Sequence, residues 1–270
     1  MTDKLVLPDD IRGLFCQDAF AEIMRLQGPV YRDVTGRRTM RIELAGNSYF
    51  IKQHFGVGWG EIIKNFLSFK MPVLGAMTEV KAIQKLTEVG IATTPLVGYG
   101  VKGGNPALQQ SFVITRDLGD ITSLEEVCVD WKSNPPDAEF KRGLIIAIAQ
   151  LAAKLHGAGL CHRDFYLCHL VLKKSDLAQG KMDLILIDLH RMLMEQSTGG
   201  AAVMKDIAGL YFSAMDCGFT AEDWALFKQH YLLQTADFWQ KVEQRAQQLY
   251  AKFHSDKFQK RLMKEKSAIH

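Results

Sequence analysis

The chain has 270 residues, of which 47% are hydrophobic and 23% are charged, and its formal net charge is +3 at pH 7. This composition is ordinary for a soluble globular protein with a sizeable core, and so small a charge gives no reason to expect a nucleic acid partner. No apolar run approaches the roughly 18 residues of a membrane-spanning helix. An odd number of cysteines, five in all, and no signal peptide predict a cytosolic protein.

The first part of the chain, to about residue 117, is rich in predicted strands. Alternating apolar and polar residues between turn residues predict five strands, at 30–34, 39–44, 48–53, 95–101 and 111–118. Between the third and fourth strands, residues 78–90 predict a helix that ends at Gly90. We therefore expect a small lobe with an antiparallel sheet and one main helix.

The second part of the chain is predicted to be mostly helical. Residues 123–131 predict a short helix with a serine cap, and residues 140–159 predict a long buried helix that glycine ends. An apolar strand is predicted at 182–190, and the chain from Met204 onward predicts further helices. The two parts join near residues 115–118, where we expect a hinge.

The stretch LCHRDFYLCHLVL, residues 160–172, carries the most specific motif. Kinase-like phosphotransferases use a catalytic loop of the form H-R-D-x-x-x-x-N, in which the Asp accepts the proton of the acceptor hydroxyl and the Asn helps to hold a metal ion. Asp164 occupies the Asp position here, but His169 stands in the position of the Asn. The tripeptide is weak evidence by itself, because it also occurs by chance.

Three further residues follow the order that phosphoryl transfer requires. Lys52, in the third strand, is the candidate for holding the nucleotide phosphates, and Glu79, on the next helix, is the candidate for orienting that lysine. Asp188 follows a buried strand 24 residues after Asp164 and is the candidate metal ligand. Each residue alone has an ordinary structural explanation, such as a solvated lysine. Together with Asp164 they indicate a kinase fold.

The predicted fold class is therefore α+β, with the two lobes of a protein-kinase-like fold. We expect an N-terminal lobe over residues 1–117, with an antiparallel sheet, one main helix and the phosphate lysine. We expect a mostly helical C-terminal lobe over residues 118–270, with the catalytic loop and the metal-binding aspartate.

Two parts of the protein-kinase pattern are missing. The first hairpin has YRDVTGRRTM in place of a glycine-rich loop, and Asp188-Leu189-His190 stands in place of D-F-G. Arg37 and Arg38 are candidate phosphate donors in that hairpin, although a solvated hairpin tip is the favoured interpretation. With no A-P-E motif, the chain is not expected to act on protein substrates.

Other patterns are weaker. The pairs Cys161-His162 and Cys168-His169 have no standard zinc spacing, so we do not expect a zinc site. Residues 61–75 have an amphipathic, weakly basic pattern, which indicates either a helix packed on its own lobe or a surface that faces anionic lipid. The tail has the same sign of charge and is otherwise a solvated helix end; its basic residues are Lys257, Lys260, Arg261, Lys264 and Lys266.

These residues resemble the lipopolysaccharide core heptose(I) kinase family of Gram-negative bacteria. The resemblance extends from about Gly28 to Gly218 and rests on HRDFYLCHLVL, IDLHRM, AGNSYFIK, EIIKNFLSFKMPVLGA, VCVDWKSNPPD and KDIAGLYFSAM. It implies ATP-dependent phosphorylation of the first heptose of the inner core, on a lipid A-anchored acceptor at the cytoplasmic face of the inner membrane.

Residue roles follow from this resemblance by position. Asp164 is implied as the base, Asp188 as the metal ligand and Lys52 as the phosphate lysine. Asp206 resembles the aspartate that braces the catalytic loop from beneath, although a carboxylate near a helix N-terminus is almost as good an explanation. The resemblance does not identify the residues that hold the sugar, and it identifies no protein partner.

His169 leaves two roles open. Its imidazole is a poorer ligand for Mg²⁺ than an Asn carbonyl, and direct metal ligation would favour Mn²⁺. The favoured alternative is that His169 donates a hydrogen bond to Asp164 or to a phosphate oxygen. Two other functions also compete with a heptose kinase: a catalytically silent kinase fold that acts as a binding module, and a kinase for small molecules or for the Kdo sugar.

Overall fold

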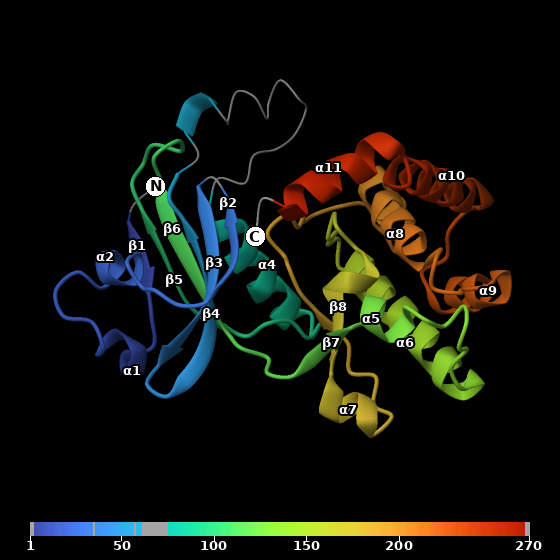
Figure 1. Ribbon diagram of the computed structural model, residues 1–270, viewed down its shortest axis with the longest axis horizontal. Coiled ribbons are helices and arrows are strands. Elements are labelled where there is room, and N and C mark those ends of the chain that lie inside the picture. Colours follow the sequence, from blue (N-terminus) through green and yellow to red (C-terminus); the bar gives the residue numbers. More distant parts are fainter. Residues whose placement is uncertain (1–2, 35, 57, 61–74, 268–270) are drawn as a thin grey trace. The chain divides into compact units, whose positions relative to one another are not determined.

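The computed structural model describes residues 3–34, 36–56, 58–60 and 75–267 of the chain (Figure 1). The amphipathic segment expected at 61–75 therefore lies outside the described residues, except for its last glycine. Among the described residues, no helix has the length and apolar character needed to cross a membrane.

The chain divides into two compact units. The first unit comprises Met1–Gly119 together with Ile187–Met192, and the second comprises Asp120–Leu186 together with Leu193–His270. The sequence predicted one boundary, after residue 117, and did not predict that Ile187–Met192 belongs to the first unit. That segment carries Asp188, whose carboxylate makes an ion pair with Lys52, so these two candidate residues belong to one unit.

The first unit is built on a six-stranded antiparallel sheet with the order β1-β5-β6-β4-β3-β2 (Figure 1). Its strands are β1 (Lys4–Val6), β2 (Val30–Val34), β3 (Arg37–Leu44), β4 (Asn47–His54), β5 (Leu96–Lys102) and β6 (Gln110–Arg116). The five strands expected from the sequence are present, and β1 is additional. Its three residues are too few to give a periodic pattern. Ala45 and Gly46 join β3 to β4 with φ values of 49° and 75°, the left-handed backbone that tight hairpins require.

The hydrophobic core of the first unit lies on one face of this sheet. Two short helices, α1 (Asp9–Arg12) and α2 (Ala19–Ile23), contribute Ile11, Phe20 and Ile23 to it. The strands contribute the alternate residues that are buried, including Met40, Ile42, Ile51 and Phe112. Because side chains alternate along a strand, the intervening residues of β3 and β4 point to the opposite face.

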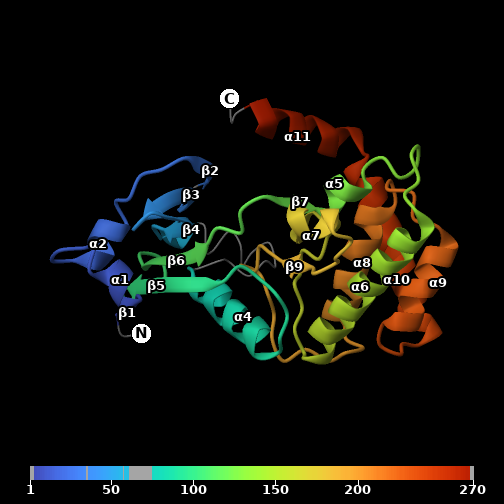
Figure 2. The same ribbon diagram turned by 90° about the horizontal axis from the view of Figure 1, so that it is seen from below.

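The main helix of the first unit is α4 (Met77–Glu88), which packs against β5 and β6 (Figure 2). Its apolar face carries Val80, Ile83 and Leu86, all buried. The chain leaves the helix through Gly90, whose φ of 67° matches the predicted glycine end. The expected helix at 78–90 is thereby confirmed.

The second unit is mostly helical, with one small sheet of order β7-β8-β9. Its elements are β7 (Ile121–Ser123), α5 (Leu124–Cys128), α6 (Ala138–Gly157), the short 3₁₀ helix η1 (Leu167–His169), β8 (Leu170–Lys173), α7 (Lys174–Ala178), β9 (Ile185–Leu186), α8 (Ala201–Ala214), α9 (Ala221–His230), α10 (Ala236–Phe253) and α11 (Asp256–Ser267). Helix α8 packs along α10, and α6 packs along α9 (Figure 2).

Capping side chains fix the starts of the two helices that were expected here. Ser123 accepts a hydrogen bond from the backbone N–H of Glu126, whose carboxylate accepts one from the backbone N–H of Ser123. Asp137 caps α6 by accepting from the backbone N–H groups of Glu139 and Phe140. Helix α5 ends at Cys128, three residues earlier than expected.

The strand predicted at 182–190 is wrong for most of its length. Only Ile185 and Leu186 pair with a neighbouring strand, β8. The chain then reaches Asp188, whose φ of 61° is in the left-handed region and cannot continue a strand. The apolar residues of this run are buried because the segment passes through the interior, so apolarity alone overestimated the strand.

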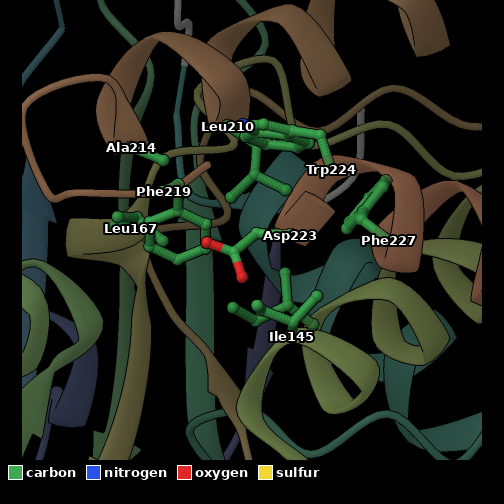
Figure 3. A pocket seen from close by; sticks show the side chains of 9 residues that line it. Ile145, Leu167, Leu210, Ala214, Phe219, Asp223, Trp224 and Phe227 are labelled. Carbon is green, nitrogen blue, oxygen red and sulfur yellow. The ribbon is translucent and has the colours of Figure 1, made fainter. Parts of the chain in front are cut away.

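A small apolar cavity lies between α6, α8 and α9 in the second unit (Figure 3). Its volume is about 10 Å³, at most enough for a single water molecule, so it is a packing gap and not a ligand site. Asp223 lies at its wall, where its carboxylate pairs with Lys141 at 2.5 Å. This pairing explains how a carboxylate is accommodated beside apolar side chains.

Candidate active site

The first unit brings together three of the predicted residues. The Nζ atom of Lys52 lies 2.7 Å from Oε1 of Glu79 and 3.4 Å from Oδ1 of Asp188. Glu79 is 3% exposed, and its other carboxylate oxygen is buried without a hydrogen-bond partner among the described residues. A buried carboxylate needs a cation, and here Lys52 supplies it.

The position of Lys52 follows from the strand pattern. Ile51 points into the hydrophobic core, so Lys52 points to the opposite face of β4, where its cross-strand neighbours are Thr39 and Val113. Burial would lower the pKa of Lys52, but the carboxylates of Glu79 and Asp188 outweigh it and raise the pKa above its ordinary value. The lysine is therefore a fixed positive charge at neutral pH.

Asp188 is held in an unusual backbone conformation next to a histidine. Its φ of 61° lies in the left-handed region, which is strained for a residue other than glycine. The Nδ1 atom of His190 lies 2.7 Å from its Oδ1, and Lys52 approaches the same oxygen. Neither the turn nor the role of His190 was evident from the sequence, which gave only the order Asp-Leu-His.

Arg37 points to the same side of the sheet as Lys52. It lies opposite His54 in the β3–β4 pairing, two residues before Thr39, the partner of Lys52. Burial and the charge of Arg32 lower the pKa of Arg37, while the carboxylates of Asp188 and Glu79 oppose this effect, which places the guanidinium near both acids. The sequence favoured a solvated position at the hairpin tip for Arg37. This prediction is wrong, because the residue is partly buried.

Arg38 behaves differently from its neighbour. Its guanidinium makes two hydrogen bonds to one carboxylate oxygen of Asp33, at 2.9 and 3.0 Å, across the β2–β3 hairpin.

His54 completes the group around Lys52. Burial, followed by the nearby side chains of Arg37, Lys52 and His190, lowers the pKa of His54 to about 3. His54 is therefore neutral at pH 7.

The second unit holds the HRD loop, and Asp206 is the residue that fixes it. The backbone N–H groups of His162 and Arg163 donate to the two oxygens of its carboxylate, at 2.5 and 2.7 Å. Arg163 has a φ of 72°, so the loop makes a strained turn just before Asp164. Asp206 is buried in the middle of α8, so the alternative of a carboxylate near a helix N-terminus is wrong.

A buried histidine and tyrosine support Asp206 in turn. Nε2 of His156 lies 3.3 Å from its carboxylate, and Nδ1 of His156 lies 2.7 Å from the hydroxyl of Tyr231. Since a carboxylate only accepts, Nε2 carries the proton and Nδ1 accepts from the tyrosine. Cys161 completes a buried group with metal-ligand atoms, but burial raises the pKa of its thiol to about 12, which opposes metal binding.

His169 lies in the same loop and donates back to it. Its Nδ1 atom is 2.6 Å from the main-chain oxygen of Asp164, so this nitrogen carries a proton. The hydrogen bond to Asp164 that the sequence favoured is present, although it reaches the carbonyl and not the carboxylate.

Helix α8 packs directly on the loop at Gly209. A Cβ atom added there would lie 3.0 Å from the ring of Tyr166 and 3.1 Å from the carbonyl oxygen of Phe165.

Comparisons with known proteins identify the family of the chain. Residues 21–231 match the lipopolysaccharide kinase (Kdo/WaaP) family. The chain belongs to this family. It is similar to the lipopolysaccharide core heptose(I) kinase WaaP of Pseudomonas aeruginosa, with 43% identity over 84% of this chain and 86% of that protein. It is also similar to WaaP of Escherichia coli K12, with 45% identity over 80% of this chain and 82% of that protein.

A solved structure extends the comparison to the fold. This structure, of WaaP in complex with acyl carrier protein, has 36% identity and a TM-score of 0.78, and the match covers 92% of this chain and 99% of that one. The family and the kinase-like fold predicted from the sequence are therefore confirmed. Within the Kdo/WaaP family fold, the first unit carries Lys52, Glu79 and Asp188, and the second carries Asp164 and His169.

Asp206→Asn should disable the HRD loop without affecting the first unit. An amide can accept only one of the two loop hydrogen bonds, and its NH₂ group would face a backbone donor, leaving a buried N–H unsatisfied at about 1–3 kcal/mol. We expect kcat to fall at least about 10-fold with little change in the KM for ATP. Steady-state kinetics on the variant and on Asp237→Asn, an exposed carboxylate of α10, measure this; an unchanged kcat would exclude the bracing role.

Proposed function

We propose that this chain is an ATP-dependent kinase that phosphorylates the first heptose of the lipopolysaccharide inner core, on an acceptor anchored by lipid A. The observation that carries the proposal is the group formed by Lys52, Glu79 and Asp188 in a member of the Kdo/WaaP family. The curated relatives named heptose(I) kinases, at 43% and 45% identity, support the acceptor. A lipid-linked acceptor also requires action at a membrane surface.

Asp164 is proposed as the base. Its carboxylate takes the proton from the heptose hydroxyl as the oxygen of that hydroxyl bonds to the γ-phosphorus, while the bond from phosphorus to the bridging oxygen of ATP breaks and ADP leaves. The strained turn at Arg163 and the two hydrogen bonds to Asp206 hold the loop that presents this carboxylate. Because the loop is held in advance, little ordering remains for the reaction itself.

Lys52 and Arg37 are proposed to hold the phosphates of ATP. Both are cationic side chains on one face of the β3–β4 hairpin. Arg37 belongs to the hairpin that replaces the glycine-rich loop of other kinases, and Lys52 is in the position of their strand lysine. Asp188 fits a divalent cation, since its carboxylate is a hard oxygen donor, 27% exposed, of the type that Mg²⁺ prefers. Such an ion would neutralise phosphate charge.

The test is transfer of labelled phosphate from ATP to inner-core lipopolysaccharide whose heptose is not phosphorylated. The wild-type chain should label the heptose, Asp188→Ala should abolish turnover, and Asp164→Asn should lower kcat far more than it changes the KM for ATP. A chain that binds ATP but labels no acceptor would be a silent kinase fold. Label that enters only Kdo or soluble small molecules would also overturn the proposal.

Arg37 and Arg38 offer a matched pair for the phosphate-binding role. Arg37→Gln should raise the KM for ATP about 10- to 100-fold, because a charge-assisted hydrogen bond to phosphate is lost. Arg38→Gln should change it less than about 3-fold, since Arg38 is paired with Asp33. Titration of nucleotide binding by fluorescence compares the two variants, and equal effects would show that Arg37 has no direct role.

His169 is proposed to position the loop through its hydrogen bond to the carbonyl of Asp164. His169→Ala should lower kcat about 10- to 1000-fold, while His169→Asn, whose side-chain amide can also donate, should recover part of this loss with Mg²⁺. Rates with Mg²⁺ and with Mn²⁺ separate this role from metal ligation. A wild-type requirement for Mn²⁺, with His169→Asn inactive in Mg²⁺, would instead indicate direct ligation by the ring nitrogen.

A further inference from the structure

A cavity of about 390 Å³ lies beside the HRD loop within the second unit. Its wall is formed by side chains from α5, the HRD loop, α8 and the end of α10. This volume is within the range of roughly 300–1,000 Å³ that small-molecule sites occupy, and it is far larger than the packing gap of Figure 3.

The cavity is joined directly to the loop that carries Asp164. Tyr166 lines it, and the backbone N–H of Tyr166 donates to the carbonyl of Asp164 at 3.0 Å. Ser213 also lines it, and its hydroxyl accepts from the backbone N–H of Leu167 at 3.0 Å. A ligand in the cavity therefore contacts Tyr166 and Cys168, which are two and four positions from the proposed base.

The lining combines aromatic rings with carboxylates. Phe212 packs edge-to-face against Tyr166 and Phe253, with ring centroids 6.1 and 5.7 Å apart, and all three rings border the cavity. Glu125, in the first turn of α5, and Asp216, just after α8, add two exposed carboxylates. The hydroxyl of Tyr250 donates to Asp216 at 2.8 Å, which fixes the direction of that carboxylate.

The charge of the cavity narrows the class of ligand. The described residues that line it include two carboxylates and no lysine, arginine or histidine, although Nε2 of His254, outside the lining, lies 3.3 Å from Oδ2 of Asp216. A phosphate or a carboxylate-bearing sugar would be repelled by Glu125, and a fatty acyl chain would offer no hydrogen-bond donor to either carboxylate. A neutral sugar suits both features, because its hydroxyls donate to carboxylates and its apolar faces lie against aromatic rings.

We propose that this cavity, which we call the acceptor groove, binds the neutral heptose that is phosphorylated, with Glu125 and Asp216 accepting hydrogen bonds from its hydroxyls. Tyr166, Phe212 and Phe253 provide the apolar surface against which the ring lies. The proposal rests on the function proposed above and assigns its sugar-binding residues. The heptose hydroxyl to be phosphorylated then lies beside the loop that carries Asp164.

Glu125→Gln and Asp216→Asn test the groove. Each removes the charge of one acceptor while keeping the size of the side chain, and a lost hydrogen bond to a charged group corresponds to roughly 10- to 100-fold in affinity. We expect the KM for heptose-terminated inner-core lipopolysaccharide to rise by that factor, with the KM for ATP within about 2-fold of wild type. The control is Glu139→Gln, an equally exposed carboxylate in the first turn of α6.

The outcomes separate this proposal from the proposed function. If the wild-type chain phosphorylates the heptose but both groove variants keep its KM, the function stands and the groove is not the sugar site. An acyl chain as the true occupant would give the same unchanged KM. Failure of the wild-type chain to phosphorylate any heptose acceptor would overturn both. Phe253→Leu provides a second variant that keeps an apolar residue, and thermal unfolding with ATP titration confirms that each variant is folded.

Discussion

The carboxylate of Asp206 is the constraint on which the acceptor side of this protein depends. It accepts from two consecutive backbone amides of a turn in which Arg163 has a positive φ, so it supplies the hydrogen bonds that stabilise a strained conformation. Nε2 of His156 donates a third hydrogen bond to this buried carboxylate, and the hydroxyl of Tyr231 donates to Nδ1 of His156. The HRD loop, the hydrogen bond from His169 and the wall of the acceptor groove all follow from where this turn is placed.

The first unit brings cationic side chains together although it has no glycine-rich loop. Lys52 is held by the buried carboxylate of Glu79, and strand alternation places Arg37 and His54 on the same face. The group contains two permanent cations beside two carboxylates, and His54 stays neutral because its pKa is lowered to about 3. On the proposed roles, side chains on this hairpin bind the phosphates that the backbone amides of a glycine-rich loop bind in other kinases.

Order and spacing along the chain were enough to predict Lys52, Glu79, Asp188 and Asp164, because each stands in a recognisable strand, helix or loop. The partners that depend on tertiary geometry were beyond that evidence. The role of Arg37 depends on the exact hairpin pairing, and the link from His156 to Tyr231 spans 75 residues. Strands β1 and β7 have three residues each, too few to give a periodic pattern. At 182–190 the continuous apolar run predicted a strand much longer than the two residues of β9.

The assignment of Ile187–Met192 to the first unit determines which groups of residues can be changed independently. The ion-paired residues Lys52, Glu79 and Asp188 are encoded far apart but are structurally one group, and the HRD loop with its brace is another. On the proposed roles, substitutions around the acceptor groove change which sugar is accepted without disturbing the ion pairs of Lys52. Acceptor preference and nucleotide affinity are then separable properties of the protein.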